Sequence, residues 1–401
     1  MPQTIAPISA PVMPTRPPAH SQTTAADGDF AAVFHGHIPA KQAATQKSPS
    51  LGKQAAEKRQ ETQNPSQTGI GAASVAAGNN LQEASTIDEH SSAFPAGFAQ
   101  HIAGDGAAGK RPVAVVIENN ILARPQWGLS TPDILIEGLA EGGISRMLAL
   151  YSDIESAPKL GPVRSARIDF IELAQGFDAI YAHWGQSDSA KEMIAKYKID
   201  ELNGETDSGG VGSTFKRDTS RDTALEHTGY TTGALLKKAI DKASFRKTIK
   251  SGYGSLLSFE PQSSPAAPGG GACASISFSY SSSYAHEFKY DAENKVYLDF
   301  MGSSPMKDGN NGKQYAPVNV VILYANVPLL KGSKELVDMD LSSGSGIYAS
   351  NGAYQKIKWQ KGSMYQPLKL MNEAGEPLKL NAGRSYIGIV PAGRAGSTKI
   401  K

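Results

Sequence analysis

The sequence predicts an α/β fold: a mixed sheet with flanking helices, then a smaller, mostly antiparallel β-domain, with a disordered tail in front. Between residues 106 and 255, short apolar runs alternate with helical patterns, which is typical of a mixed α/β domain. Between residues 276 and 395, apolar and polar residues alternate as they do in strands. Residues 1–105 are rich in Ala, Ser, Thr, Gln, Pro and Gly and bury too little apolar surface to offset the entropy of ordering.

Composition narrows the functional classes. The 401 residues suffice for about two or three domains, and a formal net charge of +2 gives no reason to expect nucleic acid as a partner. The single cysteine, Cys273, excludes an internal disulfide and a thiolate metal cluster within one chain. No apolar run approaches the roughly 18 residues of a membrane-spanning helix. Residues 1–18 lack the basic segment and apolar run of a secretion signal, so a cytoplasmic location, a trimmed or mis-started signal and another export route all stay open.

The first domain contains apolar runs that predict strands and spaced apolar residues that predict helices. Strands are expected at 113–117, 146–151 and 179–182, while 134–136 is a strand or the start of a helix. Helices are expected at 168–175, 189–197 and 232–247. Asp188 is the expected cap of the second helix.

The second domain is marked by a change of pattern. Residues 256–275 are expected to form a linker or long loop, because Pro, Gly and Ser dominate 261–271. Beyond it, strands are expected at 276–280, 295–300, 318–324 and 386–390. Turns rich in Gly and Asn separate them at 309–312, 350–352 and 373–375, and Asn-Gly between alternating segments favours a hairpin.

Several strings in the chain together resemble the YerB family, a bacterial cell-envelope family that carries domain of unknown function 3048 in N- and C-terminal parts. The strings are RPVAVVIEN at 111–119, GPVRSAR at 161–167, DAIYAHWG at 178–185, FKRDTSR at 215–221 and GRSYIGIVP at 383–391. The resemblance covers roughly residues 110–391 and leaves the tail outside.

The resemblance implies an extracytoplasmic or membrane-associated protein, because many members look like exported lipoproteins. This sequence departs from that pattern, since its one cysteine, Cys273, lies deep in the chain and no lipobox cysteine is seen. The anchor is therefore in doubt, and the missing signal keeps a cytoplasmic location open. The family has no assigned activity that could be transferred to this chain.

The arginines of GPVRSAR are the leading candidates for a binding site. Arg164, Ser165 and Arg167 lie between a predicted strand and a predicted helix, where guanidinium groups and helix N-terminal amides suit an anion. We expect Arg146, Arg217, Asp218 and Arg221 to add to this site if the fold brings them together. The alternative is structural ion pairing of these arginines with Glu137, Glu141, Asp169 and Asp218.

Other side chains carry weaker signals. His183 follows a predicted strand and suits an acid, base or ligand, although a structural histidine is the commoner outcome. His227 is a loop histidine with a smaller functional expectation. Ser165 lacks the Gly-x-Ser-x-Gly context of a nucleophile. Trp127, Tyr181 and Trp184 line a sugar or peptide groove or, more commonly, pack in the core.

Acidic residues and glycines add no defined cofactor site. Asp133, Glu137 and Glu141 would share one face of a helix, with Arg146 a simpler partner for them than a metal. No metal site is predicted, and no nucleotide-binding glycine motif is present. The cofactor, if any, is unknown from the sequence.

Two principal functions fit these observations. One is a non-enzymatic envelope module that binds a wall component or a partner protein. The other is an enzyme acting on a phosphorylated or polyprenyl-pyrophosphate-linked wall precursor, with the arginines holding the phosphates; this rests on an analogy of layout. Convergence of Arg164, Arg167 and Arg217 in one cleft would favour the enzyme, and their use in ion pairs would favour the module.

Overall fold

The computed structural model describes residues 109–206, 214–250 and 257–401. The tail predicted at residues 1–105 lies outside the described residues. All described residues belong to one compact unit, Thr86–Lys401.

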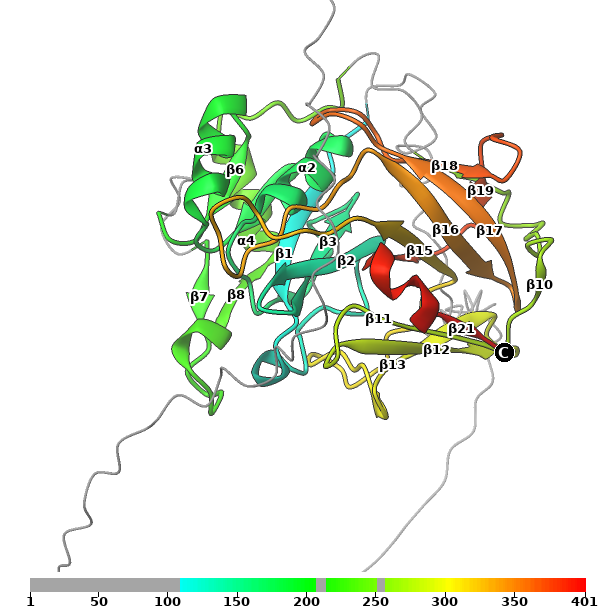
Figure 1. Cartoon of the computed structure of the whole chain (residues 1–401). Helices are drawn as coiled ribbons and strands as arrows, with labels where there is room; N and C mark the ends of the chain where they lie inside the picture. The colour runs from blue at the N-terminus through cyan, green and yellow to red at the C-terminus, as the bar shows by residue number, and fades with distance from the viewer. Residues whose placement is uncertain (1–108, 207–213, 251–256) are drawn as a thin grey trace, which may run out of the picture. The chain divides into compact units, whose positions relative to one another are not determined.

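One large mixed sheet runs through both halves of the described chain (Figure 1). Its strands in spatial order are β6 (Glu201–Asn203), β5 (Ile180–His183), β1 (Val113–Glu118), β3 (Ile144–Tyr151), β2 (Ile134–Glu141), β20 (Ser385–Pro391), β15 (Asn319–Ala325), β16 (Ser343–Ser350), β17 (Ala353–Gln360) and β10 (Gly271–Ala272). A further strand, β18 (Lys369–Asn372), also pairs with β17. Parallel pairs such as β1–β5 and antiparallel pairs such as β1–β3 occur side by side, so the sheet is mixed as predicted.

The C-terminal strand β20 joins the two halves. It lies parallel to β2 on one side and parallel to β15 on the other. Every residue from Ser385 to Val390 is buried, because both faces of the strand are covered. The domain boundaries expected from the sequence stay predictions; the hydrogen-bonded sheet crosses from residues 113–203 into residues 271–391.

Helices cover one face of the sheet in its N-terminal half. They are α2 (Ile168–Gly176) and α3 (Asp188–Tyr197), and Phe170 of α2 packs in the same core as Ala114 and Val116 of β1. The predicted α3 is present, but its cap is Ser187, whose Oγ accepts from the Ala190 amide at 3.2 Å, and not Asp188. Asp188 is instead the first helical residue, where a negative charge suits the helix dipole.

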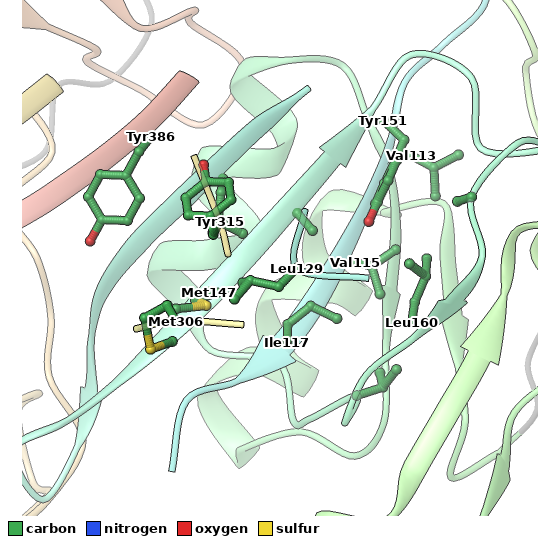
Figure 2. Close-up of a cluster of buried hydrophobic side chains, with 14 of the residues drawn as sticks. Val113, Val115, Ile117, Leu129, Met147, Tyr151, Leu160, Met306, Tyr315 and Tyr386 are labelled. Atoms are coloured by element: carbon green, nitrogen blue, oxygen red, sulfur yellow. The ribbon is translucent and has the colours of Figure 1, made fainter. Parts of the chain in front are cut away.

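The other face of the sheet is covered by a helix and by a second sheet. The helix α4 (Gly233–Lys242) begins after Thr232, which caps it, and it ends five residues before the predicted Lys247 because Ala243 is already extended. Figure 2 shows the side chains that this face contributes from β1, Val113, Val115 and Ile117, on the side where Leu129 and Leu160 lie. Alternate residues of β1 thus enter opposite cores, which explains its unbroken apolar run.

The second sheet is antiparallel and confirms the predicted β-rich part of the fold. Its strands are β14 (Ser304–Pro305), β13 (Val296–Met301), β12 (Ala285–Asp291), β11 (Ser275–Ser279) and β21 (Lys399–Ile400) (Figure 1). Small sheets comprise β4 (Lys159–Leu160), β8 (Gly229–Thr232) and β7 (Lys216–Arg217), and β9 (Ser258–Phe259) with β19 (Lys379–Leu380). The 3-10 turns are η2 (Ile121–Ala123), η3 (Leu225–His227) and η4 (Ala392–Ser397). The Asn-Gly hairpin is present between β16 and β17, with Asn351 at φ 48° and Gly352 at φ 71°.

A fully buried charged cluster lies between the two sheets. His286 of β12 places its Nδ1 2.7 Å from Asp299 Oδ1, and its Nε2 3.3 Å from the Glu137 carboxylate. Glu137 also accepts from Ser145 Oγ at 2.6 Å and from Tyr386 Oη at 2.9 Å. The cluster therefore links β2, β3 and β20 of the main sheet with β12 and β13 of the second sheet.

The carboxylate cluster that Asp133, Glu137 and Glu141 would form on a helix is not present, and Glu141 pairs with Arg146, the partner favoured from the sequence. Residues 134–141 are a strand and not a helix, and the register shifts between Leu139 and Glu141. That shift turns Glu137 toward His286 and Glu141 toward Arg146, so the two carboxylates serve different clusters.

Asp178 anchors the start of β1. It is buried, stands at φ 54°, and forms an ion pair with Arg246. Its Oδ2 accepts from the Lys250 amide at 2.9 Å, and its carbonyl accepts from Arg111 Nε at 2.8 Å. The same residue thus ties the residues before β1 to the segment after α4.

Candidate functional site

The candidate site lies where β1 and β5 end and α2 begins. The Arg164 amide donates to Val116 of β1 at 3.1 Å, and the Arg164 carbonyl accepts from the Trp184 amide at 3.0 Å. The Ala166 amide donates to the Gly185 carbonyl at 2.9 Å. The string 164–166 is therefore held between two strand ends, the place where ligands usually bind in α/β sheets.

Arg146 and Arg167 share one carboxylate. Arg146 forms an ion pair with Glu141 Oε1, and Arg167 Nε lies 2.8 Å from Glu141 Oε2. Arg146 also donates to the Ser165 carbonyl at 2.8 Å. Burial lowers the pKa of Arg146 to about 10. The positive charges of Arg167 and Arg164 also lower it, whereas the negative charge of Glu141 raises it. This half of the site is compact and well paired.

Arg164 is more loosely held. Its Nε lies 3.1 Å from Glu118 Oε1, but at an angle unsuited to a hydrogen bond, so this buried Nε has no hydrogen-bond partner in the described structure. Its Nη1 reaches Glu226 Oε2 only at 3.4 Å. His227 places Nδ1 3.0 Å from Glu118 Oε2. Among the buried side-chain nitrogens of Arg146, Arg164 and Arg167, the Arg164 Nε is thus the one without a hydrogen bond in the described structure.

Glu118 is a weak counter-charge for Arg164. Burial raises the pKa of Glu118 above its ordinary value, and Arg164 and His227 only partly offset this effect. Because a carboxyl with a raised pKa gives up its charge more readily as the pH falls, Arg164 loses part of its partner in mildly acidic solution.

Arg217 adds a second under-compensated guanidinium. It lies over the ring of Trp184, 3.9 Å from the ring centroid, and donates to the Leu225 carbonyl at 2.6 Å. Burial lowers the pKa of Arg217, and the positive charge of Arg164 lowers it further. A Cβ on Gly229 would approach the Trp184 ring to 3.0 Å, so glycine there leaves room for the indole.

The remaining predicted residues lie in a different group. Asp218 forms an ion pair with Lys159, and with Ser220 that contact lowers the pKa of Asp218 to about 2. Arg221 lies 4.2 Å from the ring centroid of Trp127, and Lys159 lies 3.6 Å from the same centroid. Of the two alternatives for the aromatic residues, the groove is not assembled, because Tyr181 is fully buried and the two indoles are covered by these cations and by Arg217.

His183 and Ser165 are not arranged as a base and a nucleophile. His183 is fully buried; its Nδ1 contacts the Gly185 carbonyl at 2.8 Å and its Nε2 contacts Glu201. Both ring nitrogens are therefore engaged with groups other than the Ser165 hydroxyl. Among the residues that the structure describes, no three His, Cys, Asp or Glu side chains are grouped as a metal site requires.

Sequence reasoning missed two of the acidic partners. Glu118 and Glu226 pair with Arg164, whereas the expected partners Glu137, Asp169 and Asp218 face elsewhere. Glu118 is the last residue of an apolar strand, and it lies opposite Arg146 where β1 pairs with β3. A correct prediction of that strand pairing would therefore have placed Glu118 near the arginines. Nothing local marks Glu226, because its contact spans 62 residues.

No helix in the described part of the chain is both long enough and apolar enough to cross a membrane.

The fold and the site define an α/β protein with a mixed sheet and an arginine–carboxylate network at one sheet end. Residues 100–246 match the "Protein of unknown function (DUF3048) N-terminal domain", and residues 275–387 match the "Protein of unknown function (DUF3048) C-terminal domain". The chain belongs to this YerB-like family, which the resemblance of its strings predicted.

The relatives agree in sequence and structure. The chain is 32% identical over 291 residues to "Putative lipoprotein YerB" of Bacillus subtilis (strain 168). The matched region covers 70% of this chain and 82% of that protein. It is also similar to the crystal structure of YerB protein from Bacillus subtilis, with a TM-score of 0.63 and 29% identity, over 73% of this chain and 94% of that chain. The similarity confirms the predicted fold class.

Proposed function

We propose that the chain is a cell-envelope module that binds an anionic group of a wall component or of a partner protein through Arg164 and Arg217. The envelope location is supported by similarity to a protein described as a lipoprotein. The observation that carries the proposal is the loose pairing of Arg164, whose buried Nε lies 3.1 Å from Glu118 Oε1 without a hydrogen bond and beside the positive charge of Arg217. An anion accepting from both guanidinium groups would relieve their repulsion and complete their hydrogen bonding.

The charge balance supports an anion. Four arginines of the network, Arg146, Arg164, Arg167 and Arg217, face three carboxylates, Glu118, Glu141 and Glu226. One of these carboxylates, Glu118, has a raised pKa and the other two are shared between groups or partly exposed. Within this network the arginines therefore exceed the carboxylates by one, and Glu201, paired with His183, and Glu205, near Gly185, lie at the same strand ends.

Arg164→Ala should weaken binding of sulfate, phosphate and pyrophosphate by about 10-fold or more, because a hydrogen bond to a charged group contributes roughly 1.5–3 kcal/mol. Calorimetric titration of the full chain measures this. Arg394→Ala, which removes an exposed arginine far along the chain in η4, is the matched control and should bind as the unmodified chain does. Equal affinity of both variants for all three anions would sink the proposal.

Glu118→Gln should strengthen sulfate binding at neutral pH, because Arg164 then loses a competing negative charge. In the unmodified chain, affinity should rise as the pH falls toward the raised pKa of Glu118, and this rise should be smaller in Glu118→Gln. Sulfate is the suitable probe because its own charge does not change in this range. Identical pH profiles for the two proteins would show that Glu118 does not control Arg164.

The alternative of an enzyme for pyrophosphate-linked precursors stays a prediction. Measuring free phosphate in the pyrophosphate titration samples distinguishes the two functions. An enzyme would release phosphate from pyrophosphate, and a binding module would leave the pyrophosphate intact.

A further inference from the structure

Exposed aliphatic side chains are concentrated on one pair of turns. In the described residues, five large hydrophobic side chains are exposed, and three of them are Ile121 at 72%, Leu122 at 58% and Leu225 at 63%. Ile121 and Leu122 belong to η2, and Leu225 begins η3 at the end of the loop that follows β7. We refer to these three side chains as the aliphatic tip.

The loop just before η3 is hydrogen-bonded to η2, although about 100 residues separate them in the chain. Thr223 Oγ1 donates to the Leu122 carbonyl at 3.4 Å, and Arg221 Nη1 donates to the Ala123 carbonyl at 3.0 Å. Asn120 caps η2 by accepting from the Leu122 amide at 3.0 Å. The aliphatic side chains therefore protrude from backbone that is hydrogen-bonded in place.

Cationic side chains surround the aliphatic tip. They are Arg124 at the end of η2, Arg221 between the turns, Arg217 on the Leu225 carbonyl, and Arg164 on Glu226. Against these four arginines the same segments carry the exposed Asp222 and Glu226, Arg164 also pairs with the buried Glu118, and Asp218 of the same loop is paired with Lys159. The surface around the tip is therefore net positive.

We propose that the aliphatic tip inserts into the interfacial region of an anionic lipid bilayer, with the surrounding arginines on the lipid phosphates. Protruding aliphatic side chains beside basic groups are the chemistry of interfacial membrane binding. A protein partner fits less well, because a stable protein interface buries about 800 Å² on each partner and centres on aromatic anchors. Two tight turns with Ile and Leu at their ends supply neither.

This inference rests on the proposed envelope location, since an exported body must lie near a membrane to use such a surface. It does not require anion binding by Arg164 in solution. The two proposals are therefore distinguishable: sulfate titration tests the network, and lipid binding tests the tip.

The test is co-sedimentation of the full chain with vesicles of equal parts phosphatidylglycerol and phosphatidylcholine, compared with vesicles of phosphatidylcholine alone. We expect binding to the anionic vesicles and at least about tenfold weaker binding to the neutral ones. The triple variant Ile121→Ser, Leu122→Ser, Leu225→Ser should lose binding to the anionic vesicles by about tenfold or more. The triple variant should melt at the same temperature as the unmodified chain, because all three side chains are exposed.

The matched control is Leu329→Ser, a change at another exposed leucine, 52% exposed, in a segment that bridges to Val337. It should bind anionic vesicles as the unmodified chain does. Absence of vesicle binding by the unmodified chain would overturn the inference, and so would a triple variant that binds normally. Equal loss in Leu329→Ser and in the triple variant would also overturn it, because binding would then not be specific to the tip.

Discussion

Replacing His286 with leucine should lower the free energy of unfolding by about 3–5 kcal/mol, the usual cost of removing one partner from a buried ion pair. The carboxylates of Glu137 and Asp299 are 0% and 1% exposed, and His286 is the cation between them. Without it, Asp299 Oδ1 loses its 2.7 Å hydrogen bond, and two buried carboxyl groups are left without their cation in the layer between the sheets. Urea unfolding followed by circular dichroism measures the difference.

Neutralising the carboxylates is the control for this prediction. The triple variant Glu137→Gln, His286→Leu, Asp299→Asn should be more stable than His286→Leu alone, because the uncompensated charges are gone. If His286→Leu is as stable as the unmodified chain, or if the triple variant is the less stable of the two, the charged cluster is not what joins the sheets.

The same histidine sets a pH dependence of stability. Burial alone would lower the pKa of His286, but Asp299 and Glu137 outweigh it and raise the pKa to about 10 from its ordinary value of 6.5. Because the pKa of His286 is higher in the folded state than in the unfolded state, its protonation stabilises the fold fully below about pH 6.5. That stabilisation is lost as the pH rises toward about 10. Unfolding curves across this range should show the decline, and His286→Leu should lack it.

Asp178→Ala should lower the free energy of unfolding by about 3–5 kcal/mol, from a lost buried ion pair and from backbone strain. The Asp178 carboxylate is 2% exposed and pairs with Arg246, while its Oδ2 caps the Lys250 amide. Alanine at φ 54° is also strained, whereas aspartate tolerates that conformation. Thermal and urea unfolding of the full chain measure the combined effect.

Asp178→Gly separates the two causes. Glycine adopts φ 54° without strain, so Asp178→Gly should retain only the loss of the carboxylate and should be more stable than Asp178→Ala by about 1 kcal/mol. A glycine variant as stable as the unmodified chain would mean that the ion pair to Arg246 contributes nothing.

The main elements of the fold were predictable because each is encoded locally. The run at 113–117 reads as a strand buried on both faces, and the structure places alternate residues of β1 in two different cores. The Asn-Gly at residues 351 and 352 supplies the two positive φ values that a tight hairpin needs. The sequence left open whether 134–136 forms a strand or the start of a helix. It forms a strand because β2 pairs with both β3 and β20, and β20 is about 250 residues away in the chain.

The candidate site was predictable in its cations and in Glu141, but not in its other two carboxylates. Arg164 and Arg167 stand in one recognisable string, and β1–β3 pairing brings Arg146 beside them. The acidic partners depend on which strand ends meet, so Glu118 and Glu226 were missed. His286 was missed for the same reason, because its carboxylate partner Glu137 is 149 residues away and only the packing of two sheets joins them. The function of the site remains a prediction until an anion is titrated.

The place of β20 in the sheet has a consequence for biosynthesis. Residues 385–391 leave the ribosome about 250 residues after β2, yet they form the strand that separates β2 from β15. Until residues 385–391 are made, the β2 edge that later pairs with β20 has unpaired backbone N–H and C=O groups. An apolar strand with such an edge is open to pairing with other chains. The two halves of the large sheet can therefore join only late in synthesis, and the nascent chain must keep that edge from pairing wrongly while the residues in between are added.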